Sequence, residues 1–154
     1  VVSEVKEDEI IIDFFAGIGS FPISIAHVNK CKIYSVDINP EAYKYVNENI
    51  KLNKLVGEVI PIEGDIRNVI VDLPLADRII MNLPGMAKDF LDIAVNHLNK
   101  GGILNYYEFA SDYETVINRV KNVAYPRKAE ILNIRKVKSQ SPGVWHIGVD
   151  AKII

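Results

Sequence analysis

The chain has 154 residues, of which 49% are apolar and 25% charged, as in globular domains that bury a core. It has 18 Lys and Arg and 20 Asp and Glu, which gives a formal net charge of −2. This charge excludes a protein that coats itself in nucleic acid, so any RNA contact must use a local patch. The single cysteine excludes an internal disulfide, and the lack of an apolar run of membrane-spanning length excludes a membrane protein. Together with the lack of a signal peptide, these features favour a cytoplasmic location.

Strand-like and helix-like stretches alternate with short gaps, which is typical of a parallel sheet covered by helices. Apolar runs predict strands at 9–14, 32–38, 59–63, 78–82 and 103–109. Helical spacing predicts helices at 21–27, 40–51, 86–99 and 112–123. Asn39 is expected to cap the helix at 40–51, and "KGG" is expected to end the helix at 86–99. Residues 64–77 are predicted to form a long connection.

The alternation stops after the last helix. Strand-like runs at 129–140 and 144–154, joined by Ser-Pro-Gly, predict an antiparallel hairpin, whereas plain dinucleotide-binding folds continue with parallel strands. The layout resembles the class I S-adenosylmethionine-dependent methyltransferases, whose Rossmann-like α/β sheet carries one antiparallel strand. We therefore expect residues 1–154 to form one such domain, and a fragment, because the chain opens without Met.

In an open α/β sheet a ligand lies beyond the carboxyl ends of the strands. The first strand is followed by "DFFAGIG", in which Gly17 and Gly19 permit a tight turn and a close approach of backbone to a ligand. A tight turn in any α/β protein has the same pattern. Asp37 ends the second strand about 20 residues later, where an acid accepts both ribose hydroxyls or caps the next helix.

The next two strands also end in polar residues. Asp65 can accept the exocyclic amine of adenine while Ile66 lines the ring, although a turn-forming Asp after glycine is the alternative. Asn82 offers an amide whose backbone is fixed by the Leu-Pro that follows. Four ligand-compatible strand ends in this order predict S-adenosylmethionine binding, with Asp13 helping to hold the glycine turn.

Longer segments carry a more specific resemblance. They are "DFFAGIGSF", "VDINPEAYKYVNENIKLNK", "GDIRNV", "ADRIIMNLPGMAKDFLD", "GGILNYYEF" and "SPGVWHIGVDAKI". Together they resemble the archaeal and eukaryotic tRNA (guanine-N1)-methyltransferases, which modify the guanine 3′ of the anticodon. Related wybutosine-pathway enzymes transfer the aminocarboxypropyl group of the same cofactor and lack Asn-Leu-Pro after the fourth strand, so "NLP" favours methyl transfer.

The resemblance implies the residues of the site. Asn82 is expected to hydrogen-bond the edge of a guanine turned out of the tRNA anticodon loop, with Pro84 packed on its face, and these are the expected catalytic residues. No metal is implied. The implied cofactor-binding residues are Phe15, Ala16, Gly17, Gly19, Phe21, Asp37, Ile38, Asn39, Asp65, Ile66 and Asn82.

Two departures from the family pattern accompany the resemblance. Ser20 stands where family members carry proline, so the entry to the helix is expected to differ. The family places a catalytic Arg and Glu upstream of the first strand, in a segment that these residues do not include. We therefore expect the isolated chain to be inactive.

Several residues near the expected site have two interpretations. Tyr106 and Tyr107 are adjacent on a strand, so at most one is a stacking platform and the other joins the core. Glu108 is expected to be a solvated strand-end carboxylate rather than a base, and His146 a structural residue. The basic run "IRKVK" at 134–138 fits either phosphate contacts or a charge-protected edge strand.

The resemblance thus implies an archaeal, cytoplasmic enzyme that methylates N1 of guanine in tRNA. The alternatives are aminocarboxypropyl transfer, a cofactor-binding module without catalysis of its own, and a different nucleic-acid methyltransferase that acts on amino groups. The sequence leaves the oligomeric state open.

Overall fold

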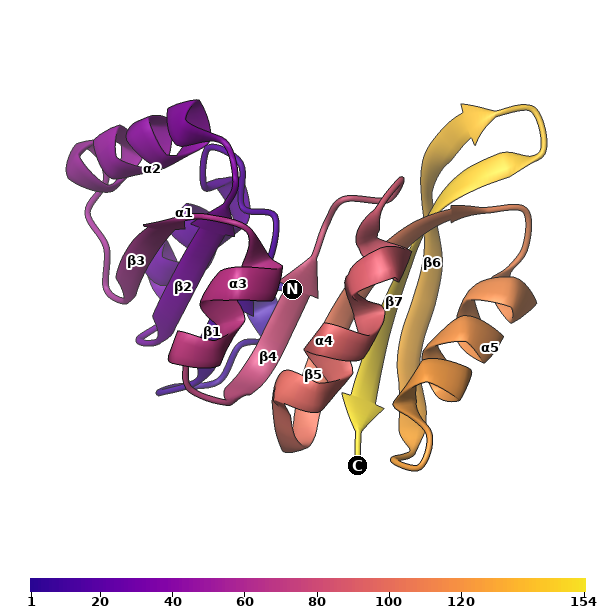
Figure 1. Cartoon of the computed structure of the whole chain (residues 1–154). Helices are drawn as coiled ribbons and strands as arrows, with labels where there is room; N and C mark the ends of the chain where they lie inside the picture. Colours follow the sequence, from indigo (N-terminus) through magenta and orange to yellow (C-terminus); the bar gives the residue numbers. More distant parts are fainter. The chain divides into compact units, whose positions relative to one another are not determined.

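The computed structural model describes all 154 residues, which form two compact units, Val1–Ile80 and Met81–Ile154 (Figure 1). The first unit holds parallel strands in the order β3-β2-β1-β4. Their bounds are β1 Ile10–Asp13, β2 Lys32–Asp37, β3 Glu58–Glu63 and β4 Ala76–Met81. The register pairs Asp13 with Ser35 and Asp37 with Glu63, so the carboxyl ends of β1, β2 and β3 lie along one edge, as predicted.

The helices of the first unit follow from local sequence. They are η1 Val2–Glu4, α1 Ser20–Val28, α2 Pro40–Leu52, α3 Ile66–Val69 and η2 Ile70–Asp72. Asn39 caps α2 as predicted, because its Oδ1 accepts a hydrogen bond of 2.9 Å from the N–H of Glu41 and Pro40 opens the helix. Helices α3 and η2 lie in the stretch predicted to be a connection, and that prediction was wrong because Asp65 caps a single helical turn.

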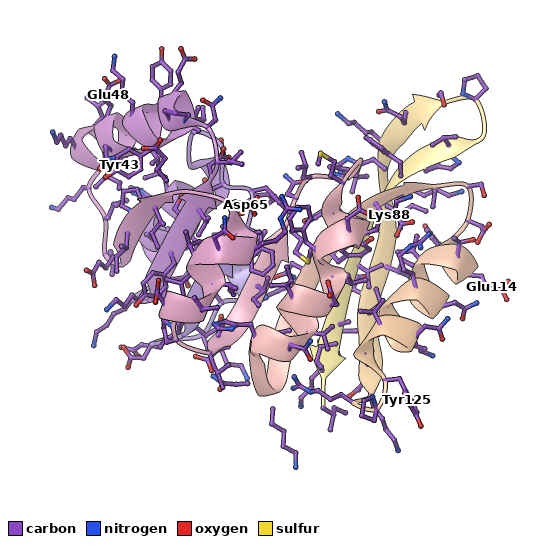
Figure 2. All side chains as sticks on the ribbon, in the orientation of Figure 1. Tyr43, Glu48, Asp65, Lys88, Glu114 and Tyr125 are labelled. Carbon is purple, nitrogen blue, oxygen red and sulfur yellow. The ribbon has the colours of Figure 1, made fainter.

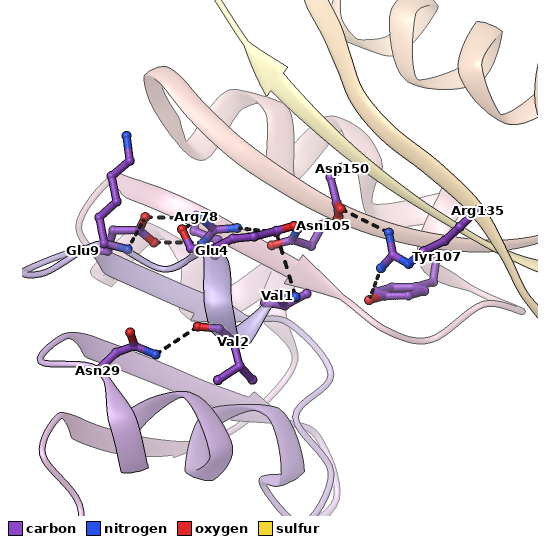
Figure 3. A network of polar contacts seen from close by, with 11 residues as sticks. Val1, Val2, Glu4, Glu9, Asn29, Arg78, Asn105, Tyr107, Arg135 and Asp150 are labelled. Atoms are coloured by element: carbon purple, nitrogen blue, oxygen red, sulfur yellow. Dashed lines mark hydrogen bonds and ion pairs between the residues drawn. The ribbon is translucent and has the colours of Figure 1, made fainter.

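A buried ion pair ties the amino-terminal ends of β1 and β4 together (Figure 3). Arg78 is 2% exposed, and its Nε donates to Glu9 at 2.9 Å while its NH2 donates to the backbone carbonyl of Glu4 at 3.2 Å. A buried guanidinium needs such partners, because an unpaired charge in the interior is strongly destabilising. This pair lies at the opposite strand ends from the glycine turn.

The second unit is an antiparallel sheet in the order β5-β7-β6. Its strands are β5 Leu98–Ala110, β6 Ala129–Ser141 and β7 Val144–Ile153, and its helices are η3 Ala87–Phe90, α4 Leu91–His97 and α5 Tyr113–Ala124. The predicted hairpin of the last two strands is confirmed, with Gly143 at φ 74° in the turn. None of the helices in either unit is long and apolar enough to cross a bilayer.

The helix predicted at 86–99 is shorter than expected. It is divided into η3 and α4, and β5 begins at Leu98, so the glycines of "KGG" lie in a strand and do not end the helix. The guanidinium of Arg127 instead donates to the carbonyls of Val95 at 2.7 Å and Leu98 at 2.9 Å. These bonds satisfy groups that a helix end leaves without partners, and they come from a residue about 30 positions away.

Candidate functional site

The turn that follows β1 is held by backbone hydrogen bonds to its neighbouring strands. The N–H of Phe14 donates to the carbonyl of Ile80 at 3.0 Å, and the N–H of Ala16 donates to that of Val36 at 2.9 Å. The N–H of Gly17 donates to the Asp37 carboxylate at 2.8 Å. The glycine turn and the acid at the end of β2 are therefore in direct contact.

The two glycines of the turn have different surroundings. Gly17 and Gly19 have φ of 58° and 91°, in the region that disfavours side chains. A Cβ at Gly17 meets no atom within 4 Å, whereas one at Gly19 would lie 2.5 Å from Val46 Cγ2 in α2. Gly17 thus leaves open space beside bare backbone, while Gly19 allows α2 to pack closely.

Asp13 lies beneath this turn and is only 1% exposed. Its Oδ1 accepts a hydrogen bond of 3.2 Å from the N–H of Phe15, so it holds the turn as expected. Burial raises the pKa of the Asp13 carboxyl to about 7, and the negative charge of Asp37 acts in the same direction. A carboxyl that titrates near neutral pH therefore lies under the glycine turn.

Asp37 is half-buried, and both of its oxygens accept backbone hydrogen bonds. Oδ2 accepts from Gly17 and Oδ1 from Asn39, at 2.8 and 2.9 Å. An ionised carboxylate has about four acceptor positions, so each oxygen retains capacity for a hydroxyl group. The next side chain, Ile38, is 66% exposed and offers an apolar surface beside the acid.

Asp65 lies at the start of α3 (Figure 2). Its Oδ1 accepts from the N–H of Arg67 at 2.9 Å, and the Arg67 guanidinium pairs with Oδ2 at 2.6 Å. These bonds hold the pKa of the Asp65 carboxyl below its ordinary value. Ile66 is 3% exposed, so its side chain packs in the interior and Ile38 offers far more surface to a ligand.

The remaining predicted residues of the first unit lie along the same turn. Phe15, Ala16 and Phe21 are half-buried, and the Phe15 ring packs edge-on against Phe14 at 6.1 Å between centroids. Sequence reasoning missed Asn49 in α2, whose amide donates to the carbonyl of Ile18 at 2.9 Å. No local pattern marks that residue, because its partner lies 31 positions earlier.

The second unit contains the "NLPG" turn after β4. The carbonyl of Leu83 accepts hydrogen bonds from Met86 at 2.9 Å and Ala87 at 2.8 Å, and that of Pro84 accepts from Phe109 at 3.4 Å. Asn82 is half-buried at the start of this turn. The backbone that carries Asn82 and Pro84 is therefore fixed by its own turn and by β5.

The expectations for β5 were partly wrong. Tyr106 and Tyr107 are 0% and 6% exposed, so neither presents a stacking face. Glu108 is 4% exposed rather than solvated, and it accepts hydrogen bonds from Arg119 Nε at 2.9 Å and from the Tyr106 hydroxyl at 2.8 Å. Burial raises the pKa of the Tyr106 hydroxyl further above its ordinary value, so the phenol keeps its proton. Arg119, on α5, is the partner that the strand pattern did not reveal.

His146 on β7 is half-buried between aromatic rings, as expected of a structural residue. Its ring centroid lies 5.5 Å from that of Tyr107 and 5.7 Å from that of Phe109, and neither ring nitrogen has a hydrogen-bond partner in the protein. Burial lowers the pKa of His146, and the charges of Lys138 and Arg135 lower it further. The imidazole is therefore neutral at neutral pH.

The basic run on β6 does not act as one group. Arg135 donates to Asp150 at 3.1 Å and to the Tyr107 hydroxyl at 3.1 Å, and Asp150 also accepts from Asn105 at 2.7 Å (Figure 3). These hydrogen bonds occupy the Arg135 guanidinium within the second unit. Lys136 and Lys138 are exposed and remain the candidates for contact with a partner.

Comparison with known families and proteins gives a consistent result. The family model described as "TRM5/TYW2 methyltransferase domain" matches residues 1–132. A Methanocaldococcus jannaschii tRNA(Phe) (4-demethylwyosine(37)-C(7)) aminocarboxypropyltransferase is 42% identical over 96% of this chain and 61% of its own length. Pyrococcus abyssi tRNA (guanine(37)-N(1))-methyltransferase Trm5b is 40% identical over 96% of this chain and 45% of its own. The chain thus spans about half the length of these relatives.

A solved structure confirms the predicted fold. The M. jannaschii TYW2 structure, in complex with AdoMet, is 40% identical with a TM-score of 0.89, and the match covers 99% of this chain and 71% of that one. The expected α/β methyltransferase architecture, with its antiparallel carboxyl-terminal strands, is therefore correct.

Proposed function

Because the chain belongs to the TRM5/TYW2 methyltransferase domain family, we propose that it binds S-adenosylmethionine and transfers its methyl group to N1 of the guanine 3′ of the anticodon in tRNA. The observation that carries the proposal is the contact between the glycine turn and the acid of β2, in which Gly17 N–H lies 2.8 Å from Asp37. Bare backbone and a carboxylate with spare acceptor capacity suit a ligand that has both a polar chain and a ribose.

Each residue of the first unit has a proposed role toward that cofactor. Asp37 accepts the ribose hydroxyls, Ile38 covers one face of the adenine, and Asp65 accepts its exocyclic amine. The open side of Gly17 lets the methionine portion approach the turn, which Asp13 holds from below. Phe15, Ala16, Phe21 and Asn39 border this surface, and the buried Gly19 and Ile66 support it from the interior. The cofactor itself supplies an electrophilic methyl group.

The "NLPG" turn is proposed to hold the guanine. The amide of Asn82 has both a donor and an acceptor for the guanine edge, and Pro84 packs against the face of the ring. Methyl transfer is an in-line displacement in which N1 bonds to the methyl carbon as the carbon–sulfur bond breaks and N1 gives up its proton to a base, so its rate depends on how well these residues orient N1. The Pro84 carbonyl accepts from the N–H of Phe109 and the Leu83 carbonyl from those of Met86 and Ala87, and these bonds support a turn rigid enough to do so.

We further propose that residues 1–154 act as one methyltransferase domain within a cytoplasmic enzyme. The family model spans both units, and the relatives described above are named as tRNA-modifying enzymes of archaea. A single reduced cysteine, Cys31, fits that compartment.

Aminocarboxypropyl transfer is a second candidate, because a relative of that name is 42% identical to the chain. The two reactions use the same cofactor and differ in which carbon bonded to sulfur is attacked. The "NLP" sequence after β4 supports methyl transfer.

The two candidates are distinguished by where a label in the cofactor goes. The complete protein that contains this chain is incubated with tRNA and with S-adenosylmethionine labelled either in the methyl group or in the carboxyl carbon. Transfer of the methyl label alone, and recovery of 1-methylguanosine from the digested tRNA, is the expected result. Transfer of the carboxyl label to a tRNA that carries 4-demethylwyosine at this position would show aminocarboxypropyl transfer, and transfer of neither label to either folded tRNA would contradict both candidates. A tRNA with adenine in place of the target guanine is the matched control.

A further inference from the structure

One exposed group of side chains in the second unit has no part in the site described above. It consists of Tyr113 at the start of α5, Lys136 on β6 and Trp145 on β7, and we call it the hairpin patch; Lys138 neighbours it on the other face of β6. The Lys136 ammonium lies 4.5 Å from the centroid of the Trp145 ring and 5.7 Å from that of Tyr113. Both lysines are exposed, Tyr113 is 37% exposed and Trp145 is half-buried.

The strand register explains how the patch is assembled. Trp145 pairs with Ala110, the last residue of β5, so the indole lies at the carboxyl end of that strand, beside the first turn of α5. On its other side β6 is irregular. Lys136 pairs with Ile147 and Lys138 with His146, so a bulge separates the lysines and turns their side chains to opposite faces of the edge strand. Cations therefore flank the strand edge next to an aromatic surface.

The charges of the patch are unpaired, which distinguishes it from the rest of the sheet. Arg135 is bonded to Asp150, and Glu108 to Arg119, but neither Lys136 nor Lys138 forms an ion pair. The chain as a whole has a net charge of −2, yet β6 carries three basic residues and one acidic residue. This local excess of positive charge attracts a negatively charged partner.

Aromatic rings and unpaired ammonium groups are the two elements that bind single-stranded nucleic acid, since bases stack on the rings and phosphates contact the cations. We propose that the hairpin patch binds an unpaired nucleotide of the RNA substrate, with its base stacked on Trp145 and the adjoining phosphate held by Lys136. The Lys136 ammonium, which lies on the indole, moves to the phosphate on binding. This inference rests on the proposed function, because it takes RNA to be the substrate.

Trp145 is the only tryptophan in the chain, so its fluorescence reports directly on the patch. The chain is titrated, without cofactor, with an unpaired oligoribonucleotide of anticodon-loop length and with a duplex of equal length. Quenching by the single strand and weaker quenching by the duplex are expected. One phosphate contact to single-stranded RNA predicts that raising the salt from 50 to 200 mM weakens binding by about 2.5-fold.

Variants measured by the anisotropy of labelled RNA separate stacking from charge. Trp145→Leu is expected to weaken binding by roughly tenfold or more, and Trp145→Phe, which keeps an aromatic face, by much less. Lys136→Ala is expected to lower the slope of log K against log salt by about 0.7, and Lys138→Ala, on the opposite face of β6, to leave it unchanged. Lys121→Ala, on the exposed surface of α5, is the charge-matched control and should leave that slope unchanged.

The proposal is overturned if Trp145 stays unquenched when RNA is bound, if the chain binds no RNA at low salt, or if the patch variants bind as tightly as Lys121→Ala. Lys136 would then serve only to shield the indole and protect the edge strand. Because these titrations need no cofactor and no methyl transfer, their failure leaves the label-transfer result standing. Loss of methyl transfer in that assay likewise leaves the stacking measurement unaffected.

Discussion

Each unit buries a carboxylate next to its candidate site, but their partners differ. Asp13 in the first unit is 1% exposed and accepts a hydrogen bond only from the Phe15 backbone. Glu108 in the second unit is 4% exposed and is bonded to both the Arg119 guanidinium and the Tyr106 hydroxyl. Burial without a cation gives a group that titrates near neutral pH, whereas burial with a cation gives a fixed ion pair.

The largest expected effect comes from removing the charge of Asp13. Its pKa is raised to about 7 in the folded chain, above its value in the unfolded chain, so its stabilising contribution is complete at pH below about 4 and is lost as the pH rises to 7. Asp13→Asn keeps the acceptor for Phe15 and removes the charge. We expect the variant to be more stable than the wild type at pH 8 by roughly 4 kcal/mol, and about equal to it at pH 4.

Urea unfolding of both proteins at several pH values measures this difference. Asp92→Asn, an exposed residue of α4, is the control. A difference that does not change between pH 4 and pH 8 would mean that Asp13 is ionised in the folded chain throughout, and the contrast with Glu108 would disappear.

The corresponding change in the second unit is expected to have the opposite sign. Glu108→Gln removes the charge that Arg119 and Tyr106 are arranged around, and it should destabilise the chain by about 3 kcal/mol at neutral pH, because breaking a buried pair leaves its partner uncompensated. The same unfolding measurement applies. A variant as stable as the wild type would show that the Glu108–Arg119 pair contributes nothing to the free energy of unfolding. The cation would then make no difference between the two buried carboxylates.

A kinetic prediction tests whether the second unit acts on the substrate. In the complete enzyme, Asn82→Ala should lower the single-turnover rate of methyl transfer by roughly a hundredfold, because its amide is proposed to orient the guanine. Its cofactor dissociation constant should change much less. Leu83→Ala, at the next and partly exposed position, is the control for disturbance of the turn. Equal losses of rate and cofactor affinity would make Asn82 a cofactor ligand only.

Glycine substitutions give a smaller effect and compare the first unit's turn with the hairpin of the second. Gly19→Ala is expected to cost about 3 kcal/mol of stability, because a Cβ there would lie 2.5 Å from Val46 in addition to the strain of its positive φ. Gly17→Ala and Gly143→Ala have positive φ but open space, and each should cost about 1 kcal/mol. Thermal unfolding measures all three, and equal shifts would show that the contact with α2 is unimportant.

Sequence reasoning succeeded where the interactions are local or follow from strand order. The Asn39 cap involves Glu41, two residues away, and the strands that carry Asp13 and Asp37 end at one edge because they are adjacent and parallel. The pattern of alternating elements was likewise enough for the fold and the hairpin. These are features that propensity and topology determine without knowledge of side-chain packing.

It failed where polar residues find partners across the tertiary structure. The Arg127 guanidinium that ends α4 lies 32 positions from Val95, and Arg135 is 15 positions from Asp150. Glu108 is a charged residue near the end of a strand, a position that is usually solvated. Only the packing of α5 reveals that Arg119 covers it. No spacing rule predicts such pairs, because they depend on which faces of distant elements meet.

The central claim is that the glycine turn and Asp37 form the cofactor site, and calorimetric titration with S-adenosylmethionine tests it most directly. Wild-type chain should bind, and Asp37→Asn, which loses hydrogen bonds from a charged acceptor, should bind roughly tenfold to a hundredfold more weakly. Asp92→Asn should bind as the wild type does, and circular dichroism should show all three to be folded. Equal affinity of Asp37→Asn and wild type, or no binding by a folded wild type at millimolar cofactor, would contradict the account.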